Sequence, residues 1–312
     1  MARFSPKRFI FLFLTFFILP VCMVLTASAQ DNEESYVEND WNYVEGSMDI
    51  SGGIPVNAMG VLESILNTGK LRVATEPYFP PQEFIDPSKS GQEAFVGPDM
   101  ELARLIAKRM GVTLEIVPMD FSEVLTAVTE GQCDLAISAL AYMPSRAMTV
   151  ELSKGYYFSD EDSGNGVLIR TKDQDTYRSV EDFSTAVIAA QSASLQEYIA
   201  AENFLNYKEF IRLNSTQDVY EALKSGKVDG AVVDVEIAET YITNEADGSV
   251  MLVPDIRFSL DEHFKGDRIA AKKGQIQLLY FVNAVIDEVL DSGQYMEWYR
   301  ESDELAQSLG LQ

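Results

Sequence analysis

The chain has 312 residues, a formal net charge of −25, two cysteines and one histidine. So negative a surface repels the phosphates of nucleic acids, which argues against nucleic-acid binding. No histidine pair or cysteine cluster has the spacing of metal ligands, so we expect neither a metal nor a cofactor. The length can hold two modest lobes or one large domain.

Residues 1–29 have the pattern of a secretory signal peptide. Three basic residues precede an almost unbroken apolar run, and an Ala-Ser-Ala sequence follows at 27–29. We expect the mature chain to begin near Gln30 and to lie outside the cytoplasm, in the periplasm or on the cell surface. Because the apolar run is nearly long enough to span a bilayer, an uncleaved membrane tether is an alternative, and a lipid on Cys22 is another.

The next segment, residues 30–57, contains seven acidic residues and no lysine or arginine. Like charges repel each other there and little apolar surface is available, so we expect a flexible acidic spacer. Without residues 1–29, which carry three basic residues and no acid, the net charge is −28 instead of −25. Cys133 is then the only cysteine, which excludes an internal disulfide, and its neighbouring apolar strand predicts a core position.

Helices and strands alternate after the spacer. The pattern predicts helices at 60–67, 98–110 and 121–130, and strands at 71–74, 112–117 and 135–137. Gly111 is placed to end the second helix, and Asp120 with Glu123 fits a capping box at the start of the third. Elements in this order form a parallel sheet covered by helices.

The stretch 131–157 carries the most specific pattern. Its strand ends in small residues where a backbone can approach a ligand closely: Ser138, Ala139 and Ala141. Pro144 and Ser145 then open a turn that presents Arg146, and the stretch ends at the aromatic pair Tyr156-Tyr157. On these residues alone, an arginine that caps a surface turn is an alternative to a ligand-binding arginine.

The second half of the chain repeats the alternation. A polar segment at 160–166 has the composition of a crossing between lobes, and Pro254 marks the predicted return crossing. Ser194 begins a second capping box, with Glu197, at a helix start that suits a carboxylate. Asp234 ends the strand 230–233, and because ligands of open α/β sheets bind beyond the carboxyl ends of strands, we expect it to face a cleft.

The stretch 131–157 resembles the signature of the family 3 extracellular solute-binding proteins, the amino-acid receptors of ABC importers. That signature is roughly G-K-x-D-x-x-x-x-G-x-T-x-T-x-E-R-x-x-x-V-x-F-S-x-P-Y, and the resemblance covers nearly all of Val61 to about Arg300. It implies a two-lobed α/β fold of the periplasmic-binding-protein type II, in which each lobe is a mainly parallel sheet with flanking helices. Lobe 1 would comprise residues 58–160 and 256–312, and lobe 2 residues 161–255.

The resemblance also assigns the ligand site. It implies that Arg146 grips the α-carboxylate of an amino acid, because a planar guanidinium makes two parallel hydrogen bonds that lysine cannot make. Asp234 would pair with the ammonium group, and Ser194 would assist at the carboxylate. The remaining implied lining residues are Glu76, Phe79, Phe121, Ser138, Ala139 and Ala141. Ala141 stands where the family usually offers a hydroxyl, and Gln82 where a second aromatic residue is common.

The implied function is capture of an amino acid for a membrane permease with its own ATPase, by a monomer that is not an enzyme. Glu76 adds a carboxylate near the implied pocket, and no lysine or second arginine stands at the matched motif positions to attract a second ligand carboxylate. We therefore expect polar or basic amino acids to be preferred over acidic ones. A same-fold enzyme, such as a cyclohexadienyl dehydratase that uses Glu76 and Asp234 as acid or base, is an alternative. A ligand-sensing receptor for a signalling partner is another.

Overall fold

The computed structural model describes residues 43–54, 57–158, 164–244, 248–259 and 265–311, all within one unit, Asn39–Gln312. The predicted signal peptide, Cys22 and most of the predicted first crossing lie outside these residues. Within the described ranges, none of the helices is both long and apolar enough to cross a lipid bilayer.

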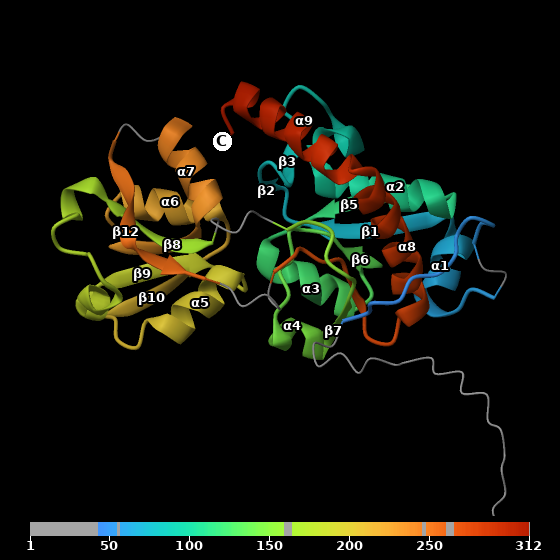
Figure 1. The fold of residues 1–312 in the computed structure, drawn as a ribbon, viewed down its shortest axis with the longest axis horizontal. Coiled ribbons are helices and arrows are strands. Elements are labelled where there is room, and N and C mark those ends of the chain that lie inside the picture. Colours follow the sequence, from blue (N-terminus) through green and yellow to red (C-terminus); the bar gives the residue numbers. More distant parts are fainter. Residues whose placement is uncertain (1–42, 55–56, 159–163, 245–247, 260–264, 312) are drawn as a thin grey trace, which may run out of the picture. The chain divides into compact units, whose positions relative to one another are not determined.

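The first sheet has five strands in the order β5-β1-β6-β13-β7. Figure 1 labels β5, β1, β6 and β7. The strands are β1 (Lys70–Thr75), β5 (Thr113–Pro118), β6 (Leu135–Ala136), β7 (Val150–Leu152) and β13 (Ala270–Lys272). β1 pairs in parallel with β5 and β6, as predicted, whereas β13 returns from late in the chain and pairs antiparallel with β6 and β7. Between β1 and β5 in the sequence, the chain forms a small antiparallel sheet of β2 (Tyr78–Phe79), β3 (Glu83–Ile85) and β4 (Phe95–Val96). We call the part built on these sheets lobe 1.

Helices from both ends of the chain belong to lobe 1. They are α1 (Gly60–Thr68), α2 (Pro98–Met110), α3 (Phe121–Thr129), α4 (Pro144–Thr149), α8 (Ile276–Ser292) and α9 (Gln294–Leu309), with a 3₁₀ turn at Gly91–Ala94. α8 and α9, drawn in red in Figure 1, pack against α2. Their apolar faces meet the buried strands β1 and β6 in one core, which is why the C-terminal segment returns to lobe 1.

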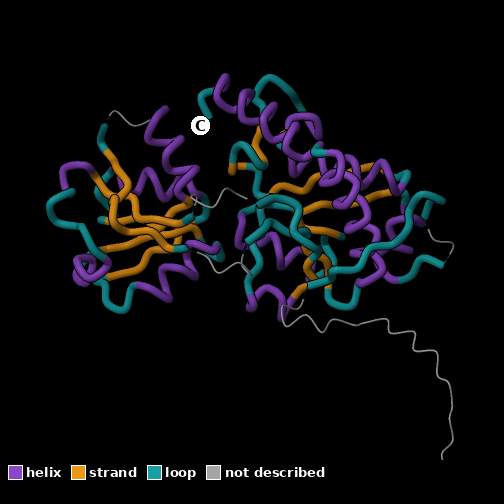
Figure 2. The backbone as a smooth tube through the Cα atoms, in the orientation of Figure 1, coloured by secondary structure: helices purple, strands orange, loops and turns teal. Residues whose placement is uncertain are grey.

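The second sheet, which defines lobe 2, has the order β10-β9-β11-β8-β12, and its strands form a group separate from those of lobe 1 (Figure 2). Its strands are β8 (Asn165–Arg170), β9 (Val187–Gln191), β10 (Glu209–Leu213), β11 (Gly230–Asp234) and β12 (Val250–Phe258). Its helices are α5 (Leu195–Asn203), α6 (Thr216–Lys224) and α7 (Val235–Asn244), with 3₁₀ turns at Thr171–Asp173 and Val180–Thr185. β9 is parallel to β10 and β11, and β8 is antiparallel to β11 and β12.

The return crossing was predicted at Pro254. The structure contradicts this, because β12 continues through Pro254 to Phe258. Pro254 is exposed, and the pairing register of β12 with β8 shifts between Leu252 and Arg257. A proline has no N–H to donate to a ladder, and an irregular edge strand is where sheets tolerate it. The exact limits of the two lobes stay a prediction.

The structure confirms some of the predicted helix ends and contradicts others. Gly111 ends α2 in the left-handed conformation, as predicted. The capping box at Asp120 is wrong, because the Asp120 side chain makes no capping bond and the Glu123 N–H donates to the Asp120 carbonyl instead, at 2.9 Å. Ser194 does cap α5 through its hydroxyl, but the Glu197 carboxylate accepts the N–H of Ala193 rather than that of Ser194.

The predicted acidic spacer is not flexible along its whole length. Residues 43–50, which we call the N-terminal strap, are bound to lobe 1. The Val44 N–H donates to the Leu152 carbonyl at 2.8 Å, and the Met48 N–H donates to the Tyr280 carbonyl at 3.2 Å. The buried Asn283 amide donates to the carbonyls of Val44 and Gly46. The prediction of a flexible spacer is therefore wrong for the strap.

Asn283→Ala is expected to destabilise the protein by about 2–4 kcal/mol. The Asn283 side chain is fully buried and also accepts the Lys154 N–H, so its loss leaves three backbone groups without this partner. Urea unfolding of the ligand-free protein measures the change. Asn203→Ala is a matched control, since Asn203 is exposed and bonds only one carbonyl of its own helix. If Asn283→Ala unfolded at the same midpoint urea concentration as the wild type, the bonds between Asn283 and the strap would not contribute to stability.

Candidate ligand-binding site

A cavity of about 190 Å³ lies at the ends of strands from both lobes. Glu76 follows β1, Ser138 follows β6, Ser194 follows β9 and Asp234 ends β11. All nine residues predicted for the site line this cavity: Glu76, Phe79, Phe121, Ser138, Ala139, Ala141, Arg146, Ser194 and Asp234. The fold therefore brings them together, and their contact with a ligand stays a prediction.

Arg146 lies on α4, a six-residue helix, and not on the predicted turn. Its guanidinium donates to the Ala141 carbonyl at 2.8 Å and, across to lobe 2, to the Ala193 carbonyl at 3.0 Å. These bonds use two of the five guanidinium N–H groups, which leaves donors for an anion. Burial lowers the pKa of Arg146 to about 10, so the group stays cationic at neutral pH. Arg146 is thus a buried, oriented cation in the cavity.

The two serines are already engaged within the protein. The Ser138 hydroxyl accepts the Glu76 N–H and donates to Glu83 at 2.9 Å. The Ser194 hydroxyl accepts the Glu197 N–H and donates to the Gln191 carbonyl at 2.7 Å. A hydroxyl has one proton, so neither serine has a donor left for a ligand while these bonds persist.

Ala139 and Ala193 hold the backbone beside Arg146 in a strained form. Their φ angles are 43° and 61°, in the left-handed region that non-glycine residues rarely adopt. The Ala139 N–H donates to the buried Asp99 at 2.9 Å, and Asp99 also accepts the hydroxyls of Tyr156 and Tyr295. This buried network fixes the Ala139 backbone at the cavity wall, because surrounding contacts must maintain such strain.

Glu76 lines the cavity from lobe 1, and Asp234 lines it from lobe 2. Glu76 is 2% exposed and accepts a hydrogen bond from the Gln191 amide at 3.2 Å. Burial, and secondly the charge of Asp120, raises its pKa to about 8. Asp234 accepts the Ile237 N–H at 3.2 Å, and burial raises its pKa to about 6. Both carboxyls are ionised less readily than in water, so a nearby cation would stabilise their charged forms.

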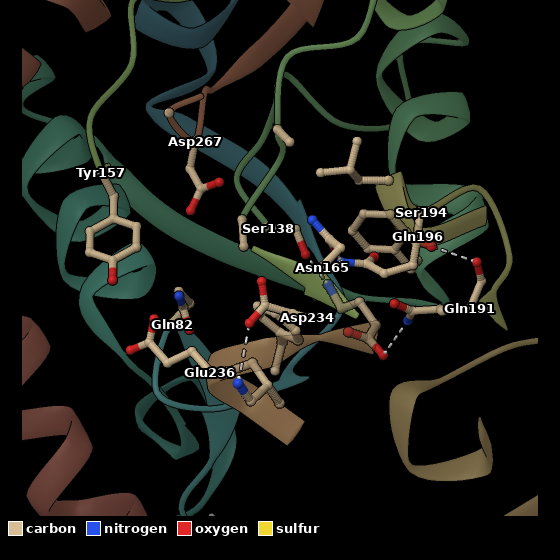
Figure 3. A pocket seen from close by; sticks show the side chains of 18 of the residues that line it. Gln82, Ser138, Tyr157, Asn165, Gln191, Ser194, Gln196, Asp234, Glu236 and Asp267 are labelled. Atoms are coloured by element: carbon tan, nitrogen blue, oxygen red, sulfur yellow. Dashed lines mark hydrogen bonds between the residues drawn. The ribbon is translucent and has the colours of Figure 1, made fainter. Parts of the chain in front are cut away.

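Several lining residues were not predicted. They are Glu83, Tyr157, Gly164, Asn165, Gln191, Leu195, Gln196, Glu236, Ile237, Ser259, Lys265, Gly266 and Asp267, while Gln82, which the resemblance placed at the position of a second aromatic residue, lines the cavity too. Gln191 ends β9 just as Asp234 ends β11, so the rule that identified Asp234 could have identified it too. Glu236 is held by the hydroxyl of Tyr299 from lobe 1, at 2.8 Å. Figure 3 shows several of these side chains around one space with Ser138 and Asp234, among them Tyr157, Asn165, Gln191, Glu236 and Asp267.

The cavity lining is strongly acidic. It contains two cations, Arg146 and Lys265, and five carboxyl groups among the described residues: Glu76, Glu83, Asp234, Glu236 and Asp267. Burial raises the pKa of Glu83 and Asp267 well above the ordinary values, and the charge of Asp99 adds to both shifts. In the described part of the chain no group of three or more metal-binding side chains could hold a metal ion. The arrangement is suited to an organic ligand with one anionic group and an excess of positive charge.

The chain is similar to known proteins in sequence and in fold. The chain is 29% identical over 227 residues to the arginine-binding extracellular protein ArtP of Bacillus subtilis, covering 72% of this chain and 82% of ArtP. Its fold matches the amino acid ABC transporter substrate-binding protein AbpA of Streptococcus pneumoniae, solved bound to L-arginine. The TM-score is 0.68, with 29% identity and coverage of 78% of this chain and 98% of AbpA.

A second solved structure is an ancestral amino-acid-binding protein described as a precursor of cyclohexadienyl dehydratase. It matches with a TM-score of 0.65 and 25% identity, covering 78% of this chain and 99% of that one. The family model of the bacterial extracellular solute-binding proteins, family 3, matches residues 71–301, and the chain belongs to this family.

Proposed function

We propose that this protein binds a basic amino acid outside the cytoplasm and delivers it to an ABC importer. The observation that carries the proposal is the charge of the cavity lining, in which five carboxyl groups outnumber two cations, the buried Arg146 and Lys265. A ligand with an α-carboxylate, an α-ammonium and a cationic side chain supplies one anion and two cations to that lining. A ligand with a side-chain carboxylate would add repulsion, which costs several kcal/mol for closely placed like charges.

The contacts suggest how such a ligand lies. Arg146 takes the α-carboxylate through its remaining N–H groups, and Asp234 takes the α-ammonium. Glu76, with its Gln191 partner, receives the cationic side chain, whose apolar stem lies against Phe79 and Phe121. The Arg146 guanidinium lies 5.5 Å from the centre of the Phe121 ring, which keeps that ring near the carboxylate end.

Contacts from both lobes link binding to closure. Among the described residues, three hydrogen bonds cross between the lobes: Arg146 to Ala193, Gln191 to Glu76 and Tyr299 to Glu236. A ligand that touches residues of both lobes favours the closed form, because only that form makes both sets of contacts. The importer's permease and ATPase would then distinguish the loaded, closed protein from the empty one.

The proposal extends to the setting of the protein. The names of ArtP and of the arginine-bound AbpA support a basic ligand and an ABC transporter as partner. A monomer, exported by its signal peptide or tethered by an uncleaved N-terminus, completes the proposal. Enzyme activity is a second possibility, favoured by one observation. Glu76 has a pKa of about 8 and could hold a proton for transfer near neutral pH, in a fold that matches a dehydratase precursor.

Competition binding tests the ligand class. Ligand-free protein, residues 30–312, is titrated with arginine, lysine, histidine, glutamine, glutamate and aspartate. We expect the basic amino acids to bind tightest and glutamate and aspartate to bind at least about 100-fold more weakly. Glutamate or aspartate outcompeting the basic amino acids would show that the pocket has been misread.

A further inference from the structure

Asp267 is a cavity residue that no sequence motif indicated. It lies just before β13, on the segment that returns the chain to lobe 1. Its N–H donates to the Tyr157 carbonyl, and its carbonyl accepts the Tyr156 N–H, each at 2.9 Å. The next residue, Arg268, donates to the Ser153 carbonyl at 3.0 Å and lies under the ring of Tyr43 from the strap. The backbone of Asp267 is therefore held on both sides.

The carboxylate of Asp267 points into the cavity, toward the space that Asp234 also borders (Figure 3). No hydrogen bond from a described residue accounts for the shift of its pKa, which burial and the charges of Asp99 and Asp234 raise and those of Arg146 and Arg268 lower. The Asp267 side chain is half-buried. A partly desolvated carboxylate without a donor is unfavourable, and a cation is the group that would stabilise it.

We propose that Asp267 is a second anchor for the ligand's α-ammonium group, which it shares with Asp234. This inference rests on the proposed function and adds a specificity-determining residue to it. A ligand's α-carboxylate and α-ammonium are attached to one carbon, so the group that binds the ammonium must lie near the group that binds the carboxylate.

The electrostatic neighbours of each acid support this placement. Asp267 interacts with both Arg146 and Asp234, the residues assigned to the carboxylate and the ammonium. Neither Arg146 nor Asp234 contributes to the pKa shift of Glu76, which comes from burial, the charge of Asp120 and the bond from Gln191. The cavity thus has an α-carbon end with two carboxyls beside one arginine, and a side-chain end at Glu76.

The same placement has a cost in the empty protein. Burial and the charges of Asp99 and Asp234 disfavour the ionised form of Asp267 in the empty protein, so a neutral isostere avoids that cost. We therefore expect Asp267→Asn to bind less tightly while its ligand-free melting temperature is equal to or higher than that of the wild type. A merely structural residue would show the reverse effect on melting.

The test compares two ligands in each protein: arginine, and 5-guanidinopentanoate, which is arginine without its α-amino group. For arginine, Asp267→Asn should lower the affinity by about 10- to 100-fold, and for the analogue by less than about threefold. The matched control is Asp255→Asn, which makes the same charge change at an exposed position on β12. This variant should bind both ligands with wild-type affinity. Asp267→Ser repeats the test, and since both ligands are measured in one variant, any loss from poor folding cancels in their ratio.

Equal losses for the two ligands, or wild-type affinity of Asp267→Asn for arginine, would overturn the role of Asp267 and leave the proposed function standing. Failure of the wild-type protein to bind any basic amino acid would overturn the proposed function itself, and this inference with it.

Discussion

Arg146→Ala abolishes useful amino-acid binding while the fold survives; this is the largest effect we expect. The α-carboxylate would be buried without its cation, which costs roughly 2–5 kcal/mol, or about 30-fold to several-thousand-fold in affinity. The variant also loses the bond to Ala193 that links α4 to lobe 2. Arg146→Lys should recover only part of the affinity, because a lysine cannot bind a carboxylate through two parallel bonds.

Calorimetry on ligand-free protein measures the loss, and circular dichroism verifies the fold. Arg178→Ala is the matched control, because Arg178 is an exposed lobe 2 arginine paired with the exposed Asp175. Near-normal affinity of a folded Arg146→Ala protein would show that the carboxylate binds elsewhere.

The second large effect is on pH dependence. Affinity for a basic amino acid should rise by up to about tenfold per pH unit between about pH 6 and about pH 8. Glu76 has a pKa of about 8 and is therefore largely protonated in the empty protein over this range. Asp234 has a pKa of about 6 and is largely protonated only below about pH 6. A bound cation favours the ionised carboxylates, so binding releases protons and strengthens as the pH rises.

Ligand-free stability should change in the opposite direction. The pKa of Glu76 in the folded protein lies above its ordinary value of 4.5, and that of Asp234 lies above 3.8. The stability that these groups contribute is complete below the ordinary values and is lost as the pH rises through the folded values of about 6 and about 8. The melting temperature of the empty protein should therefore fall across this window, while a saturating basic ligand reduces the fall.

Glu76→Gln isolates the group responsible. The glutamine cannot ionise, so the variant should bind basic amino acids weakly and should lose the part of the pH dependence between about pH 6 and about pH 8 that Glu76 contributes. Glu239→Gln, at an exposed position of α7, should keep the wild-type profile. A wild-type affinity that does not vary with pH, or an unchanged slope in Glu76→Gln, would show that Glu76 does not face the ligand's cation.

Much of lobe 1 and lobe 2 could be predicted because the signals are local. Gly111 and Ser194 mark helix ends through backbone conformation and a hydroxyl cap within the same turn. Asp234 was predicted to lie at a cleft because it follows a buried strand, and it lines the cavity. The capping box at Asp120 failed for a local reason as well, since the backbone carbonyl of Asp120 already accepts the Glu123 N–H.

The sequence by itself determined the alternation of helices and strands, the family resemblance and, through that resemblance, nine of the residues that line the cavity. Only the tertiary structure decided the position of the strap, the antiparallel return of β13 and the place of Asp267 and Glu236 in the cavity. The strap accepts hydrogen bonds from Asn283, more than two hundred residues away in the sequence. The backbone N–H of Asp267 donates to the carbonyl of Tyr157, which is also distant in the sequence. Such pairings leave no periodic pattern, because they depend on where distant segments meet and not on the residues next to them.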